Sequence, residues 1–415
     1  APVPLSLAAA LARAVAANPA LGRARTEIDV ADALRRLAIS AILPRLNLTG
    51  NYTRNSTEAS FTAGDQQVLL LPMNDWSYRL TLSQPIYAGN RERRAYGQAK
   101  LGVTNARQGA RGAEDNLLLA VAADYLAVVE GDALLDVERR NVALTADRRR
   151  QAQALFEAGE TTRVDALRAE ADIKAAERRV TEAQRLRDAA ESRLRLDLAL
   201  DSPSQAIQVA EPSQLFPPLS PAVELLAQAE RQRPEVAAAE TALESARLEV
   251  AKQQGAVLPI LTADGEYISQ RSTFPLDRYG FFALHLTVPV FQGGEVKARV
   301  AIARDRLHQA DLQLEEVRRS VREEVRRTLS DLAGAEANLA LAKEQLTAGE
   351  AEYEQAAELY RAQELTSLDA EAAENSLAEA RRAVATGKLD RDLAELRVWA
   401  AAGLLAKTVF PEVSR

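Results

Sequence analysis

The sequence predicts a mainly α-helical protein in which a helix-strand-strand-helix unit occurs twice. The passage from Leu82 to Gly89, LSQPIYAG, returns in similar form from Leu286 to Gly293 as LTVPVFQG. Residues before each copy alternate between apolar and polar, which is the period of a half-buried strand. Residues after each copy follow the helical period over a long distance. Each copy is therefore a corner at which a strand becomes a helix, and the pair indicates a duplicated protomer.

The first repeat is expected to cover residues 1–204. Helices separated at Asn18-Pro19 are followed by Leu43-Pro44, which ends helical geometry because the residue before a proline is driven toward an extended backbone. Ser, Thr, Gly, Asp and Gln dominate the segment between the two strands, which predicts a long loop. The expected elements are helices over 5–17 and 19–41, strands over 46–55 and 76–87, the loop over 56–75, and a long helix pair over 90–200 that breaks at 159–162.

The second repeat is expected to cover residues 205–415. A proline-rich irregular connector over 201–220 separates the two repeats. Arg233-Pro234 then stands where Asn18-Pro19 stood in the first repeat. The expected elements are short helices, strands over 260–268 and 280–291, a helix pair over 295–402 that breaks at 363–367, and an irregular C-terminal tail.

Proline and glycine mark the corners of both repeats. Proline cannot donate a ladder hydrogen bond, so we expect Pro85 and Pro289 to end strand pairing. Glycine lets the backbone turn into a new direction at the positions that follow. The strand-helix corners are assigned to six residues: Pro44, Pro85, Gly89, Pro259, Pro289 and Gly293.

Composition excludes several classes of protein. The net charge is −7, and Lys and Arg are spread along every helix, so no basic patch indicates nucleic acid. The absence of cysteine excludes disulfides, thiolate catalysis and a lipid-modified N-terminal cysteine. No apolar run of about 18 residues predicts a transmembrane helix, whereas transmembrane β-strands need only about 9 to 11 alternating residues. A chain that opens at Ala1 without a charged and apolar leader fits a cytosolic protein, or an exported one whose signal peptide has been removed.

No group of residues in the sequence indicates catalysis. There is no glycine-rich phosphate loop, no Ser/His/Asp order and no cluster with metal-ligand spacing. The two histidines, His285 and His308, fall on different elements. We therefore expect neither an enzyme nor a bound cofactor or metal.

The strands have one apolar face and one polar face. Their apolar positions form the set Leu46, Leu48, Tyr52, Trp76, Tyr78, Leu80, Leu82, Phe282, Leu284, Leu286 and Val288. Aromatic residues concentrate in the two strand-loop-strand stretches, as they do in the interfacial girdles of membrane barrels. Four strands leave two unpaired edges, which lipid does not tolerate, so a membrane location requires several copies. An ordinary soluble hairpin with aromatics in its core is the alternative interpretation.

Three duplicated features resemble TolC-type outer-membrane efflux proteins, the outer membrane factors. They are the twin corners, the twin strand starts at Leu43-Pro44 and Leu258-Pro259, and the twin helix breaks AGETTRVD (158–165) and AQELTSLD (362–369). The resemblance spans nearly the whole chain. It implies a homotrimer with a twelve-stranded β-barrel in the outer membrane, continued by a long α-helical periplasmic tunnel. It also implies a Gram-negative bacterium, contact with outer-membrane lipid, a removed signal peptide and no N-terminal lipid.

By this resemblance the protein is the passive exit duct of a tripartite efflux pump for small molecules. It would act with a periplasmic adaptor protein and an inner-membrane transporter of the RND, ABC or MFS type. The alternative within the same class is the outer-membrane channel of a type I protein secretion system. A soluble coiled-coil scaffold with strand inserts is the alternative from another class.

The resemblance places both helix breaks at the periplasmic tip of the tunnel. It assigns Asp165, Asp369 and Tyr360 to a periplasmic gate. The tips, as adaptor-docking positions, comprise Gly159, Thr162, Gln363 and Thr366. Two departures from the family pattern are Gln363, at the place that Gly159 holds in the first repeat, and Leu365, where a gate arginine can occur. Alternatively, both aspartates are ordinary first-turn acids favoured by the helix dipole.

Overall fold

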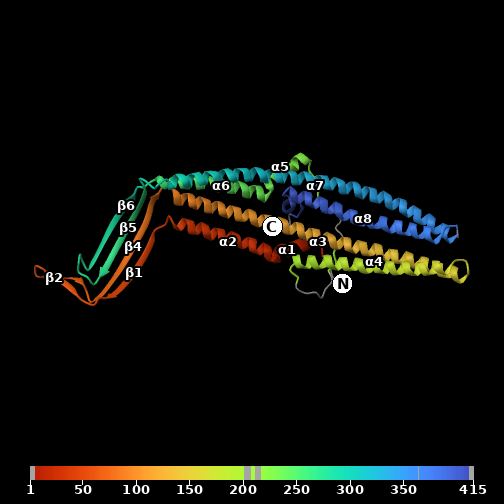
Figure 1. Ribbon diagram of the computed structural model, residues 1–415, viewed down its shortest axis with the longest axis horizontal. Helices are drawn as coiled ribbons and strands as arrows, with labels where there is room; N and C mark the ends of the chain where they lie inside the picture. The colour runs from red at the N-terminus through yellow and green to blue at the C-terminus, as the bar shows by residue number, and fades with distance from the viewer. Residues whose placement is uncertain (1–4, 201–206, 211–215, 363, 411–415) are drawn as a thin grey trace. The chain divides into compact units, whose positions relative to one another are not determined.

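The computed structural model describes residues 5–200, 207–210, 216–362 and 364–410 (Figure 1). Its helices are α1 Leu7–Ala17, α2 Pro19–Ser40, α3 Arg91–Glu157, α4 Arg163–Asp197, α5 Ala222–Gln232, α6 Pro234–Gln254, α7 Glu295–Arg361 and α8 Ser367–Ala401. Its strands are β1 Arg45–Arg54, β2 Ala59–Ala63, β3 Gln66–Leu71, β4 Asn74–Ala88, β5 Ile260–Gln270 and β6 Arg278–Thr287. A 3-10 turn, Gly255–Val257, precedes β5, and a π turn, Leu405–Val409, follows α8.

The lengths of the helices reproduce the duplication predicted from the sequence. The helices after the two corners, α3 and α7, each contain 67 residues, and the return helices α4 and α8 each contain 35. At 1.5 Å per residue each longer helix extends about 100 Å. In the described parts of the chain, no helix has a stretch that is apolar and long enough to cross a membrane.

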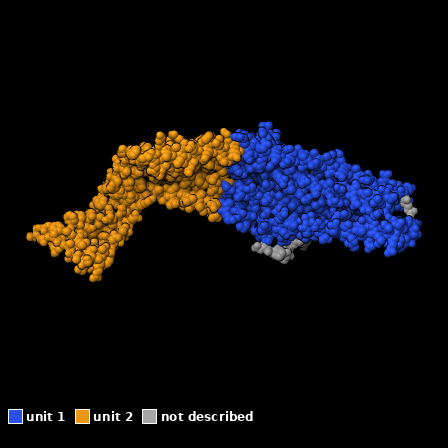
Figure 2. Space-filling model, in the orientation of Figure 1, with its two compact units in different colours: residues 1–25, 109–237, 317–415 blue, residues 26–108, 238–316 orange. Residues whose placement is uncertain are grey.

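The chain divides into two compact units, each built from both sequence repeats (Figure 2). Unit 1 comprises residues 1–25, 109–237 and 317–415 and holds α4, α8 and the larger parts of α3 and α7. Unit 2 comprises residues 26–108 and 238–316 and holds the sheets together with the helical segments next to them.

The main sheet of unit 2 has four antiparallel strands in the order β1-β4-β5-β6. Its register places the predicted apolar set on one face: Leu46 lies opposite Leu82, Leu48 opposite Leu80, and Tyr52 opposite Trp76. The same face continues across the second repeat, where Gly265 is paired with Phe282, Ala263 with Leu284, and Leu261 with Leu286. Of the predicted set, Val288 alone follows the end of its strand. The other face carries polar side chains, including Thr81, Asp264, Glu266 and His285.

Four local predictions were wrong. The segment 56–75 is not a loop throughout, because β2 and β3 form a hairpin around Gly64, whose φ is +64°. Pro85 does not end pairing: β4 continues to Ala88 with a register shift after Pro85. Pairing with β1 stops at Ser83, so Pro85 lies where β4 has lost one neighbour, a position at which a missing N–H is tolerated. The last strand, β6, ends at Thr287, before the predicted residue 291. The C-terminal tail, which was predicted to be irregular, contains the π turn.

The core of unit 1 forms around the middle of α3. Tyr125, Leu118 and Val121 of α3 are fully buried together with Leu11 of α1, Leu194 of α4 and Leu396 of α8. The Tyr125 hydroxyl lies 2.8 Å from the carbonyl oxygen of Leu5 and 2.7 Å from that of Ala210. Leu5 also forms a parallel bridge with Val209, which is one of the four connector residues described over 207–210. Residues 201–206 and 211–215 of the predicted connector lie outside the described residues.

Each short helix begins beside the end of a return helix. The Asn18 amide donates to the carbonyl oxygen of Asp197 at the end of α4, 3.3 Å away. In the second repeat, the Arg233 guanidinium donates to the carbonyl oxygen of Ala400 in α8, also 3.3 Å away. Both contacts lie within unit 1, and they show that the duplication extends to the junctions between helices.

Candidate functional site

The first helix-hairpin tip connects α3 to α4 through Gly159, whose φ is +76°. Thr162 caps α4, and its hydroxyl oxygen accepts a hydrogen bond from the Asp165 backbone N–H at 3.3 Å. The Asp165 carboxylate accepts in return from the Thr162 backbone N–H at 3.3 Å and from the Thr162 hydroxyl at 2.7 Å. This reciprocal capping box satisfies helix-start donors that would otherwise lack partners.

The second tip repeats only part of that arrangement. Thr366 caps α8 by accepting from the Asp369 backbone N–H at 3.2 Å, and its hydroxyl donates to the Asp369 carboxylate at 2.6 Å. Gln363, which was predicted to belong to this tip, lies outside the described residues. Asp369 thus serves its own helix start.

Asp165 also joins the two tips. The Ser367 hydroxyl, at the start of α8, donates to the second carboxylate oxygen of Asp165 at 3.1 Å, and Thr161 donates to the first at 2.9 Å. The hydrogen bond from Thr162, followed by those from Thr161 and Ser367, lowers the pKa of Asp165 to about 2. The structure therefore brings Asp165 together with Ser367 of the second tip and holds it as an anion at neutral pH.

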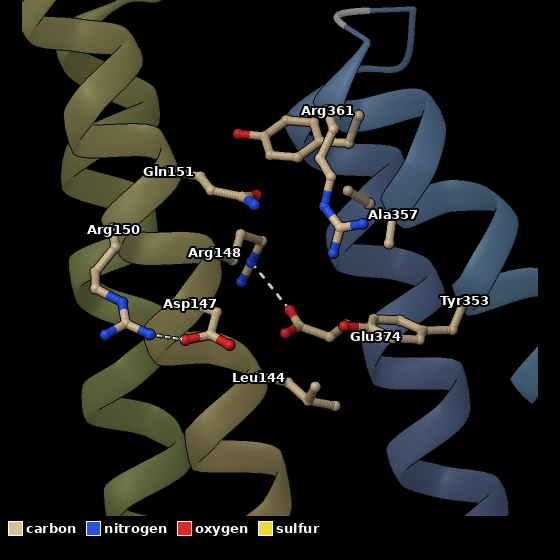
Figure 3. A pocket seen from close by; sticks show the side chains of 11 residues that line it. Leu144, Asp147, Arg148, Arg150, Gln151, Tyr353, Ala357, Arg361 and Glu374 are labelled. Atoms are coloured by element: carbon tan, nitrogen blue, oxygen red, sulfur yellow. Dashed lines mark hydrogen bonds and ion pairs between the residues drawn. The ribbon is translucent and has the colours of Figure 1, made fainter.

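Tyr360 lies in the last turns of α7 and is 9 % exposed. It lines a cavity of about 250 Å³ between α3, α7 and α8, together with Leu144, Tyr353, Glu374 and other residues (Figure 3). Burial raises the pKa of its hydroxyl. Among the described residues the Tyr360 hydroxyl has no hydrogen-bond partner, so the ring accounts for the packing of this residue.

A buried ionic cluster that was not predicted from the sequence lies at the same cavity. Arg148 of α3 has a side chain only 10 % exposed, and it contacts Asp172 of α4 at 2.7 Å. It also contacts Glu374 of α8 at 3.0 Å (Figure 3). Glu371 of the same helix lies 3.7 Å from it. Burial raises the pKa of Glu374 although Arg148 opposes the shift. One cation therefore holds three carboxylates from two helices.

A second buried cluster, of opposite sign, lies three helical turns earlier on α3. Glu138 has a side chain 6 % exposed and contacts Arg382 of α8 at 2.9 Å and Arg179 of α4 at 3.6 Å. These buried charges were not identified from the sequence. A usable signal was present, because Glu138 and Arg148 continue the stripe of buried positions that includes Leu135, Asn141, Thr145 and Ala152.

The two strand-helix corners lie in unit 2 and differ in packing. Gly89 is buried with a φ of +63°, and a Cβ at this position would lie 2.2 Å from the carbonyl oxygen of Gly255. Gly293 and Gly294 have φ values of +58° and +85°, and a Cβ at either would meet no atom within 4 Å. Pro44 and Pro259 lie directly before β1 and β5, whereas Pro289 follows the end of β6.

The described residues contain no group of three or more His, Cys, Asp or Glu placed to hold a metal ion. His285 lies 3.6 Å from Asp264 on the polar face of the sheet. The chemical features of unit 2 are therefore a sheet with one apolar and one polar face, whose outer strands each have one edge without a partner among the described residues. Those of unit 1 are a linked pair of helix tips and the buried charges near them.

Comparison with known proteins identifies a family for this arrangement. The family model described as "Outer membrane efflux protein" matches residues 10–199 and 225–404. The outer membrane efflux protein BepC of Brucella suis biovar 1 is 25% identical over 385 residues, which cover 90% of this chain and 79% of the relative. The alkaline protease secretion protein AprF of Pseudomonas aeruginosa is 26% identical over 347 residues, which cover 78% of this chain and 68% of the relative.

A solved structure has the same fold. The outer membrane channel CmeC of Campylobacter jejuni superposes with a TM-score of 0.82 at 18% identity, covering 99% of this chain and 89% of that one.

Proposed function

Because this chain belongs to the outer membrane efflux protein family, we propose that three copies form a passive exit duct through the outer membrane. The main observation in favour of this trimer is the sheet of unit 2, which has one apolar face and one polar face. Its apolar face would contact lipid, and its outer strands β1 and β6 each have one edge without a partner among the described residues. Three four-stranded sheets joined edge to edge would close twelve strands into a barrel and leave no edge in lipid.

The helices of unit 1 would form the tunnel that leads to this barrel. In this proposal a periplasmic adaptor and an inner-membrane transporter of the RND, ABC or MFS type supply the cargo, and the duct itself catalyses no reaction. Small molecules are the proposed cargo, by analogy with the efflux proteins that this chain resembles.

Type I protein secretion is the second candidate, and the similarity to the alkaline protease secretion protein favours it. Cargo would be selected by the transporter, so isolation of the duct with its adaptor and transporter separates the two candidates. Recovery of a transporter that exports peptides would support secretion, and recovery of a multidrug transporter would support efflux.

Purification and conductance test the exit duct directly. The protein should require detergent for extraction, migrate as a trimer and produce single channels in planar bilayers. A protein that stays soluble and monomeric without detergent would instead support the scaffold interpretation. A pull-down with purified adaptor tests the proposed docking positions Gly159, Thr162, Gln363 and Thr366.

We also propose that Asp165 and Asp369 control passage at the tips. In a trimer six carboxylates would surround a narrow opening, where they would attract cations and repel one another. Replacing both aspartates with Ala should lower the cation selectivity obtained from the reversal potential under a salt gradient. Unchanged selectivity would leave them as helix-start acids. Tyr360→Phe should raise conductance only if the hydroxyl latches a neighbouring copy, whereas Tyr360→Ala should raise it through lost packing.

A further inference from the structure

We propose that Arg148 and Glu138 of α3, two buried charges of opposite sign, fix the axial register of α4 and α8 and hold both helices against α3. We call this pair of charges the charge code. Both residues lie in unit 1, on the helix that leads to the first tip. Neither belongs to the tip residues Asp165, Asp369 and Tyr360. The relevance of this code to passage rests on the proposed function, whereas its effect on the protein's own stability does not.

The arrangement around Arg148 is stable only while the cation is present. Its guanidinium contacts Asp172 of α4 and both Glu374 and Glu371 of α8, and the Arg148 and Glu374 side chains are 10 % and 6 % exposed. Figure 3 shows the pair of Arg148 and Glu374. Guanidinium suits this position because its delocalised charge can attract several carboxylates at once, while one of its N–H groups donates to Asp172. Without it, three carboxylates would face one another where water is largely excluded.

The arrangement around Glu138 is the inverse but is less enclosed. Its buried carboxylate faces Arg382 of α8 and Arg179 of α4, and each arginine side chain is 35 % exposed. Long arginine side chains at that exposure can turn toward water if the carboxylate is lost. Loss of Glu138 is therefore less costly than loss of Arg148.

Opposite signs at the two points discriminate between registers. On each partner helix an acid lies nearer the tip and an arginine lies about two turns farther away: Asp172 and Arg179 on α4, Glu374 and Arg382 on α8. A slip of two turns toward the tip would bring an arginine to Arg148. A slip in the other direction would bring an acid to Glu138. Each slip puts like charges together in a buried place, which is costly, so the sequence specifies against both.

The charge code predicts a pH dependence that a packing role does not. Glu374 is faced by Arg148 of α3, by Asp172 and Arg179 of α4 and by Glu371 of its own helix, and the neutral Tyr353 of α7 lies close by. Arg148→Met removes the main attraction that favours the charged form of Glu374. The folded-state pKa of Glu374 then rises further above its unfolded value. Stability is consequently kept at low pH and lost as pH rises through the folded-state pKa.

The test compares midpoints of thermal unfolding for the full chain purified in one detergent, at pH 5 and pH 8. Arg148→Met should lower the midpoint by roughly 5 °C at pH 8 and by much less at pH 5. Glu138→Met should lower it by a smaller amount that is equal at the two pH values, because this change leaves no buried carboxylate without its cation. Arg150→Met is the matched control, since Arg150 pairs with Asp147 of the same helix and both side chains are exposed.

A double variant separates charge from volume. Adding Glu374→Gln to Arg148→Met removes one of the three carboxylates without changing its shape, so it should recover a large part of the loss at pH 8. An equal loss for Arg148→Met at both pH values, no difference from Arg150→Met, or no recovery in the double variant would each overturn the charge code. If Arg148→Met alone fails to fold, recovery of folded double variant supports the code and its failure overturns it. Absence of channels in planar bilayers would count against the proposed function and leave this test intact.

Discussion

The two corners have the same sequence pattern and almost the same backbone turn, yet they pack differently. In the first repeat Gly89 is buried against Gly255 and Leu258, which precede β5. In the second repeat Gly293 and Gly294 are exposed, and a Cβ added at either position would meet no described atom within 4 Å. A repeated motif therefore specifies the turn, whereas the neighbouring strand decides how tightly that turn is enclosed.

The difference follows from the order of strands. The first corner ends β4, which has β5 beside it, whereas the second ends β6, which lies at an edge of the sheet. In the proposed trimer, β6 of one copy would pair with β1 of the next. The repeat-related counterpart of Gly255 is Ser40, so we expect the end of α2 from a neighbouring copy to cover the second corner.

Substitution of Gly89 and of Gly293 should give the largest difference in folding stability between the two corners. Gly89→Ala combines a left-handed backbone strain of about 1–2 kcal/mol with overpacking of about 1–3 kcal/mol. Gly293→Ala should cost only the strain within a single copy. The yield of folded protein and its unfolding free energy measure both. Equal losses for the two variants before assembly would remove the basis of the comparison.

A charge introduced into the strand before a corner tests which face of the sheet contacts lipid. Leu284 of β6 and Leu80 of β4 are repeat-related, and both lie on the apolar face. A lysine at Leu284 should oppose insertion by about 2–4 kcal/mol if it lies near the bilayer midplane. Thr81→Lys, on the opposite face, is the matched control. Equal insertion defects in an outer-membrane assembly assay would contradict the lipid-facing assignment.

The two tips provide a third comparison, because Asp165 links both tips and Asp369 serves one. Asp165→Asn should speed backbone amide exchange at the starts of α4 and α8, whereas Asp369→Asn should speed it at α8 alone. The lowered pKa of Asp165, about 2, places its stabilising contribution above the unfolded pKa and removes it as pH falls through about 2. At pH 7 the two variants should therefore differ in the amide exchange rates at the start of α4. Exchange confined to α4 in Asp165→Asn would show that the Ser367 contact is dispensable.

The smallest effect is expected at the prolines. Pro289→Ala should lower trimer yield more than Pro217→Ala, because Pro289 lies between the edge strand and its corner while Pro217 lies in the connector. Changes of this kind alter stability by about 0.4–1 kcal/mol, partly through the unfolded chain. The trimer yield of each variant can be measured on native gels. A lower yield for Pro217→Ala than for Pro289→Ala would indicate that the glycines alone determine the turn at the second corner.

Most of the fold was predictable because duplicated local signals agreed with each other. The helix breaks and the strand faces follow from proline, glycine and apolar periodicity. The family assignment came from the resemblance of the twin motifs, and the comparisons confirm the family and the fold class. The hairpin around Gly64 was missed because its strands are short, five and six residues, and lie in a segment with many Ser, Thr, Gly, Asp and Gln residues. The position of Pro85 within β4 was missed because it depends on where β1 ends.

The buried charges were missed for a different reason. Periodicity shows that Glu138 and Arg148 share a stripe with core positions, but it does not show which opposite charges meet them. Their partners Asp172, Arg179, Glu374 and Arg382 come from two other helices, and only tertiary packing brings them together. The gate and docking roles of the tip residues stay predictions until conductance and binding are measured.

The bridge between Leu5 and Val209 has a consequence for the order in which the protein matures. The ribosome makes Leu5 long before Val209, and Tyr125, whose hydroxyl lies beside both backbone segments, is made in between. The segment around Leu5 therefore stays unpaired until Val209, at the start of the second repeat, has emerged. A growing chain interrupted before the connector would leave α1 without this anchor and would expose its apolar face, which is buried in the complete fold.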